Sequence, residues 1–189
     1  MKHKILVLAS TILAATSVHA EVNPMFKVGL DTGGDTLYQA TFTDGSTKSI
    51  KANGGAFFGG GISVINDAKD IEAEVSISYK TDTIAAKNGD VKWTRFPVDA
   101  LLFYRVPHFR VGAGLTYHLS PKLTGSGAAG SFDISVENAM GMLLQADYGF
   151  SDKMFLGLRY TGIEYKPANC AGCTPAKGNG VGLVFSISL

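Results

Sequence analysis

Residues 179–189 read NGVGLVFSISL and alternate more regularly than any other stretch of the chain. Val181, Leu183, Phe185, Ile187 and Leu189 occupy every second position, and small or polar side chains fill most positions between them. A period of two is typical of a strand whose two faces meet different environments. A strand with lipid on one face and a polar lumen on the other has this pattern, so the stretch favours a membrane barrel.

The beginning of the chain predicts export. Residues 1–4 read MKHK and form a short basic segment, residues 5–15 form an apolar run, and residues 18–20 place small side chains before a potential cut. This order is typical of a secretory signal peptide, with cleavage predicted between Ala20 and Glu21. Residues 21–189 would then form one domain with 15 Lys and Arg residues against 16 Asp and Glu residues. Such a balance offers no basic stripe, so no nucleic-acid partner is expected.

Seven further segments alternate in the same way. They are separated by short turns after the second, fourth and sixth segments and by long loops at 124–131 and 167–177. Barrels inserted from the periplasm alternate short inner turns with long outer loops. The eight segments lie at about 26–42, 58–64, 71–80, 95–105, 109–119, 134–150, 154–161 and 179–189.

The pattern as a whole predicts an all-β fold, an eight-stranded antiparallel up-and-down transmembrane β-barrel. A soluble barrel of the lipocalin type would reverse the two faces, with apolar side chains inside. Aromatic residues on the apolar face support the membrane barrel, because aromatic girdles flank the lipid-facing band. The predicted lower girdle comprises Phe26, Tyr104, Phe109, Tyr148 and Phe150, and the upper girdle Tyr79, Tyr117 and Tyr160.

Two strand motifs carry a family resemblance. Residues 110–121 read RVGAGLTYHLSP and residues 156–160 read LGLRY. Together with the signal peptide and the apolar final strand, they resemble the small outer-membrane β-barrel proteins of Gram-negative bacteria, the OmpX and OmpA-barrel class within the porin-like superfamily. The resemblance implies a location in the bacterial outer membrane, contact with its lipid and lipopolysaccharide, and insertion by the outer-membrane assembly machinery. Many such barrels end on Phe, whereas this chain ends on Leu189.

The polar face predicts a lumen filled with charge. An eight-stranded barrel is only wide enough for its side chains to fill, and unpaired charge in that space is costly. We therefore expect matched ion pairs that plug the lumen and a structural role for each charged residue. The inward set comprises Lys27, Lys80, Arg95, Arg105, Arg110 and Arg159 against Asp31, Glu72, Glu74, Asp99, Glu137 and Asp147.

One set of residues raises an enzymatic alternative. His118, Ser120 and Glu137 resemble the His-x-Ser and Glu arrangement of lipid A deacylase barrels. A Ser activated by a His that a carboxylate orients is a workable nucleophile. However, alternation directs His118 into the lumen, whereas the catalytic groups of that family face the membrane. The ordinary interpretation is a His at a strand end and a Ser at the start of a loop.

The only two cysteines form a C-x-x-C pair, Cys170 and Cys173, in the last predicted loop. In an exported chain, a disulfide that closes this loop is favoured over a redox or zinc role. We expect no cofactor, no metal site and no enzymatic activity. The preferred function is structural, adhesive or envelope-protective, with a host or surface ligand at the extracellular loops. The alternatives are a narrow channel for small or hydrophobic solutes and a lipid A-modifying enzyme.

Overall fold

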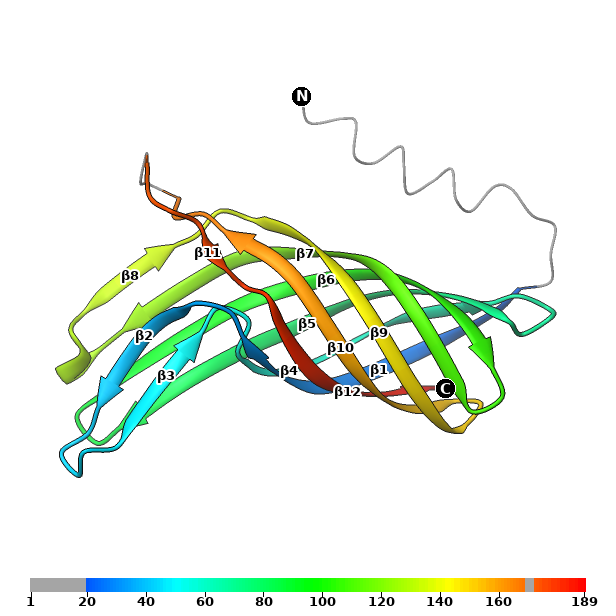
Figure 1. The fold of residues 1–189 in the computed structure, drawn as a ribbon, viewed down its shortest axis with the longest axis horizontal. Coiled ribbons are helices and arrows are strands. Elements are labelled where there is room, and N and C mark those ends of the chain that lie inside the picture. The colour runs from blue at the N-terminus through cyan, green and yellow to red at the C-terminus, as the bar shows by residue number, and fades with distance from the viewer. Residues whose placement is uncertain (1–19, 169–171) are drawn as a thin grey trace.

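The computed structural model describes residues 20–168 and 172–189, and within them eight antiparallel strands pair in a closed cycle (Figure 1). The last strand pairs with the first, with Phe185 opposite Val28. The predicted all-β class and eight-stranded barrel are therefore confirmed. In order around the barrel, the strands are β1 (Glu21–Gly33), β4 (Gly55–Ile65), β5 (Ile71–Ala86), β6 (Gly89–Val106), β7 (Phe109–Gly125), β9 (Ala139–Ser151), β10 (Met154–Tyr165) and β12 (Gly180–Ser188).

The two faces of the strands differ as the alternation predicts. On β12, Leu183 is 52% exposed on the outer surface, while Ser186 is 4% exposed in the interior. The same contrast recurs on β7, where Val111 and Leu115 are exposed and Arg110 and Thr116 are buried. A soluble barrel would bury the apolar set, so the structure favours the interpretation with lipid outside.

The two ends of the barrel differ in their connections. Residues 66–70, 107–108 and 152–153 form short turns at one end, here called the short-turn end. The opposite end, here called the loop end, carries the remaining elements: β2 (Thr36–Thr41), β3 (Thr47–Lys51), η1 (Gly127–Ala129), β8 (Phe132–Ser135) and β11 (Ala176–Lys177). Among the described residues, no helix has the length and apolar character that crossing a membrane would require.

The prediction that the first strand continues to residue 42 is wrong. Gly33 and Gly34 both adopt left-handed backbone angles, with φ of 114° and 81°, which L side chains rarely tolerate. The chain leaves the barrel wall at this point and forms the separate two-stranded sheet of β2 and β3. The returning segment is held at the bend, where the Asn53 N–H donates to the Gly33 carbonyl over 3.0 Å.

The sixth predicted segment, 134–150, is also interrupted. Residues 132–135 form β8 and pair with the end of β7, and the barrel strand β9 begins only at Ala139. On β7 itself, the alternation is shifted at Ser120, a non-glycine residue with a φ of 48°. Thr94 lies opposite Lys122 and Phe96 opposite Leu119, so β7 has one extra residue in this interval, which is a β-bulge. Beyond the bulge, Leu123 is buried.

Candidate functional site

The charged groups of the lumen gather around Arg110 near the short-turn end. Its guanidinium lies 2.7 Å from Asp147 Oδ2, 2.6 Å from Glu74 Oε1 and 3.0 Å from Glu72 Oε2. These partners come from β9, which pairs with β7, and from β5, which is separated from β7 by β6, so Arg110 on β7 links three strands on one side of the barrel. Arg105 completes the cluster with a 2.9 Å contact to Glu72.

Aromatic rings enclose the same guanidinium. The Arg110 Cζ lies 4.2 Å from the ring centroid of Phe103 and 3.9 Å from that of Phe155. Both rings are buried, and Arg110 is 1% exposed. A cation between two desolvated rings gains attraction from their quadrupoles in addition to its ion pairs. Packing therefore fixes the plane of the guanidinium as well as its charge partners.

A second cluster forms around Asp99, farther along the lumen. Its carboxylate accepts hydrogen bonds from Lys27 at 2.7 Å, from Arg159 at 3.1 Å and from the Thr116 hydroxyl at 2.6 Å. Arg159 also donates to Gln145 Oε1 over 2.9 Å. The cluster joins β1, β6, β7, β9 and β10 through side chains alone.

A third cluster meets the chain segment that leaves the barrel wall. Lys80 pairs with Asp31 and donates to Asn53 Oδ1 over 3.0 Å. Arg95 is fully buried and donates to the Gly54 carbonyl over 2.6 Å. No described carboxylate lies within 4.0 Å of its guanidinium, so the expectation that every inward charge is matched by an opposite charge is wrong at Arg95. Alternation predicts which face of the strand a side chain points to, but not its level along the barrel axis. At the level of Arg95, the acceptor that it reaches is the Gly54 backbone carbonyl.

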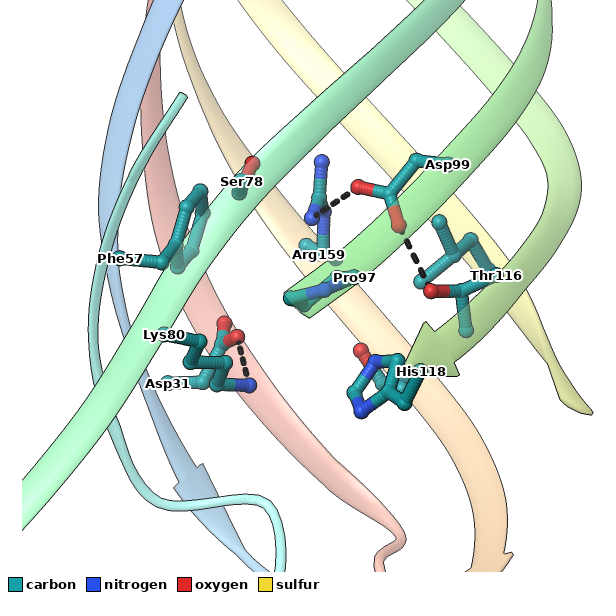
Figure 2. Close-up of a pocket in the computed structure, with 11 residues that line it drawn as sticks. Asp31, Phe57, Ser78, Lys80, Pro97, Asp99, Thr116, His118 and Arg159 are labelled. Atoms are coloured by element: carbon teal, nitrogen blue, oxygen red, sulfur yellow. Dashed lines mark hydrogen bonds and ion pairs between the residues drawn. The ribbon is translucent and has the colours of Figure 1, made fainter. Parts of the chain in front are cut away.

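Little free space is left between the second and third clusters (Figure 2). The cavity there has a volume of about 10 Å³ and is lined by Asp31, Ser78, Asp99, His118 and Arg159, among others. A space of about 10–15 Å³ holds roughly one water molecule. The interior is therefore packed with side chains at this level.

Above the charged clusters, the loop end is closed by an apolar group that the sequence did not reveal. We call it the mouth cluster, and its buried members are Ile50, Ala52, Ile84, Val91, Trp93, Leu123, Ala139, Ile163 and Tyr165. Trp93 is its centre: the indole meets the Tyr165 ring at 5.4 Å edge to face and donates to the Ala52 carbonyl over 3.1 Å. The β2–β3 hairpin contributes Ile50, so it covers the mouth of the barrel.

The enzymatic candidates are not brought together. His118 is buried, and its Nδ1 lies 2.6 Å from the Tyr165 hydroxyl. Ser120 is exposed at the bulge, and its N–H donates to Asn138 Oδ1 over 2.9 Å. Glu137 is exposed between β8 and β9, so its predicted place in the lumen is wrong. The interruption of the sixth segment places it in a connection. Among the described residues, no three His, Cys, Asp or Glu side chains are arranged to hold a metal ion.

The predicted girdle residues lie on the outer face. Seven are exposed, namely Phe26, Tyr104, Phe109, Tyr117, Tyr148, Phe150 and Tyr160. Tyr79 is half-buried between two rings that the prediction omitted, Phe58 at 5.8 Å and Phe96 at 5.4 Å. Phe58 and Phe96 belong to the alternating apolar set of their strands, so their positions alone do not separate them from Val and Ile residues in the same set. Their aromatic rings are the signal that could have identified them as girdle residues.

Two predictions fall on parts of the chain that the structure does not describe. The predicted signal peptide covers residues 1–20, of which the structure describes only Ala20. The first strand, β1, begins at Glu21. Cys170 also lies outside the described residues, whereas Cys173 is within them. The cleaved signal and the Cys170–Cys173 disulfide therefore stay predictions.

Comparison with known proteins places this architecture in a family. Residues 5–187 match the model of the outer membrane protein beta-barrel domain. A solved structure of Ail, the attachment invasion locus protein of Yersinia pestis, in complex with the heparin analogue sucrose octasulfate has a similar fold, with a TM-score of 0.57 and 10% identity over 89% of this chain and 97% of that one. Neisserial surface protein A aligns over 90% of this chain and 99% of its own, with a TM-score of 0.45 and 14% identity. No curated protein matches the sequence. Because the family model spans nearly the whole chain, this chain belongs to the outer membrane protein beta-barrel domain family.

Proposed function

We propose that this protein is a non-enzymatic barrel of the bacterial outer membrane that holds its loop end as a rigid, ligand-binding surface. The observation that carries the proposal is the closed lumen. Ion pairs fill the middle of the barrel, and the mouth cluster covers the loop end. With the interior occupied, the surface at the loop end is the part left for recognition.

The alternatives have less support. A conduit needs a continuous path, and the space between the second and third charged clusters is limited to about 10 Å³. A lipid A-modifying enzyme would need His118, Ser120 and Glu137 in contact, and they lie respectively in the lumen, at a bulge and in a connection. The proposal therefore assigns no catalytic role to these residues.

The family and the outer surface of the barrel support the proposed environment. Exposed apolar side chains on every barrel strand suit lipid and lipopolysaccharide around the wall. Insertion would depend on the outer-membrane assembly machinery after export by the predicted signal peptide. Ail, a barrel of similar fold, has been solved in complex with the heparin analogue sucrose octasulfate, which supports a ligand-binding role for the proposed surface.

We expect the purified barrel to give no stepwise conductance in planar lipid bilayers at any voltage up to the limit of bilayer stability. Bacteria that display it should adhere to cultured epithelial cells several-fold more than bacteria that carry the empty vector. The matched control is a barrel in which residues 36–51 are replaced by a short Gly-Ser turn, with insertion checked by heat-modifiable gel mobility. Discrete channels of constant size would contradict the closed lumen, and unchanged adhesion would contradict the surface role.

A further inference from the structure

A groove of about 760 Å³ lies at the loop end between the β2–β3 hairpin and the tip of the β5–β6 hairpin. One wall is a continuous stretch of β2 and the residues after it, from Tyr38 to Thr43. The other wall is residues 84–89, with Ala128 and Ala129 of η1 beside them. The volume falls within the range of about 300–1,000 Å³ that is usual for ligand sites.

The wall formed by β2 is a free strand edge. Phe42 donates to the Ser46 carbonyl over 2.8 Å, and Ala40 lies opposite Lys48, so these residues direct their backbone groups toward β3. In an antiparallel pair, the intervening residues direct theirs to the opposite side. Gln39 and Thr41 are those residues, and both line the groove. Among the described residues, β2 pairs with β3 alone, and neither the Gln39 N–H nor the Thr41 N–H has another backbone partner.

The floor of the groove is apolar and continuous with the mouth cluster. Ile84 and Val91 are buried beneath it, and Tyr38, Ala40 and Phe42 pack against the same cluster from β2. A strand added beside β2 would therefore direct every second side chain onto this floor and the others toward solvent. The six residues of β2 at about 3.3 Å each give room for a partner strand of five or six residues.

We propose that the groove binds an extended polypeptide segment, which adds to β2 as a third strand of the small β2–β3 sheet. This inference rests on the proposed ligand-binding role and names its partner class. Main-chain pairing with Gln39 and Thr41 supplies affinity, and alternate apolar side chains over Ile84 and Val91 supply selectivity. A free edge presents alternating donors and acceptors that match a peptide backbone, and a sulfated sugar or an acyl chain lacks this alternating pattern.

The test uses the full barrel in lipid nanodiscs and a phage library of random linear octapeptides. We expect enriched peptides with apolar residues at alternate positions, and slower hydrogen exchange at the amides of Gln39 and Thr41 when the best peptide is bound. Methylating every second backbone nitrogen of that peptide, on the edge that faces β2, should weaken binding at least tenfold. No enrichment, or equal binding of the methylated peptide, would overturn the proposal.

The chain offers a matched pair of variants. Thr41 and Thr47 lie directly opposite each other, and neither N–H contributes to the β2–β3 ladder, so proline at either position leaves the hairpin bonds intact. Only Thr41 lines the groove. Thr41→Pro should raise the Kd of the selected peptide at least tenfold, and Thr47→Pro should change it less than twofold. Equal effects of the two variants would count against strand addition at β2.

The outcomes separate this inference from the proposed function. If displayed barrels promote adhesion and Thr41→Pro changes neither adhesion nor peptide binding, the surface role stands and strand addition is wrong. If the peptide binds at β2 and displayed barrels do not promote adhesion, the site stands and the adhesive role fails.

Discussion

Replacing Arg110 by leucine is expected to lower the free energy of unfolding by about 3–5 kcal/mol, because it leaves buried carboxylates without their charge partner. Arg110 is the ion-pair partner of Glu74 and Asp147 and shares Glu72 with Arg105. All three carboxylates are buried, so water cannot replace the guanidinium. Urea titration in phospholipid vesicles would measure the loss, and the single tryptophan of the sequence provides the fluorescence signal.

Two further sets of substitutions test whether the loss of stability comes from the unpaired buried carboxylates. Lys122→Ala removes an ion pair with Asp133 whose side chains are 44% and 57% exposed, and should lower stability by about 1 kcal/mol or less. Adding Glu74→Gln and Asp147→Asn to Arg110→Leu should recover part of the loss, since the uncompensated charges disappear. A loss below about 1 kcal/mol for Arg110→Leu would contradict the buried network described above.

Replacing Trp93 by alanine should lower stability by about 3–5 kcal/mol, the usual cost of truncating a large buried aromatic side chain. The indole is 1% exposed and joins the barrel wall to the covering segment through the Ala52 carbonyl. Its loss should also free the β2–β3 hairpin, so trypsin should cleave after Lys48 and Lys51 faster than in the parent protein. Far-UV circular dichroism in urea would follow global unfolding, and mass spectrometry would locate the cuts.

Trp93→Phe is the control for this prediction. Phenylalanine keeps most of the packing against Tyr165 and removes the hydrogen bond to Ala52, so we expect a loss of only about 0.5–1.5 kcal/mol. Tryptic cleavage of the hairpin should then stay close to the parent rate. If Trp93→Ala unfolded like the parent and its hairpin resisted trypsin equally, the mouth cluster would not be what holds the cover in place.

Much of the lumen follows from alternation. Because successive side chains on a strand point to opposite faces, fixing Leu183 as lipid-facing fixes Gly182 and Val184 as inward-facing. The same argument directs Lys27, Asp99 and Arg110 inward, where the structure buries them. It fails at Glu137 because the barrel strand begins only at Ala139. A single extra residue reverses the later side chains of a strand, as the bulge near Ser120 does for Leu123, and an interruption takes residues such as Glu137 out of the wall. Nothing in the local pattern marked those points.

Alternation could not predict which charged side chains pair with one another. Arg110 meets Glu74, 36 residues away, and Lys27 meets Asp99, 72 residues away. These contacts depend on strand register and on the curvature that brings non-neighbouring strands face to face across a narrow interior. Arg95 shows the limit most clearly, because its partner is the backbone carbonyl of Gly54, in a segment that none of the predicted strands includes.

The sequence by itself determined the strand count around the barrel, the outer and inner faces of most strands and the polar character of the interior, since all three depend on a local period of two. The tertiary structure decided which charges pair, where the wall bulges and that residues 36–51 leave the wall and pack against the mouth cluster. That packing depends on two left-handed glycines and on Ile50 and Trp93, 43 positions apart in the chain, joining the same buried cluster. Contacts of this kind arise from closure of the barrel, which no local pattern encodes.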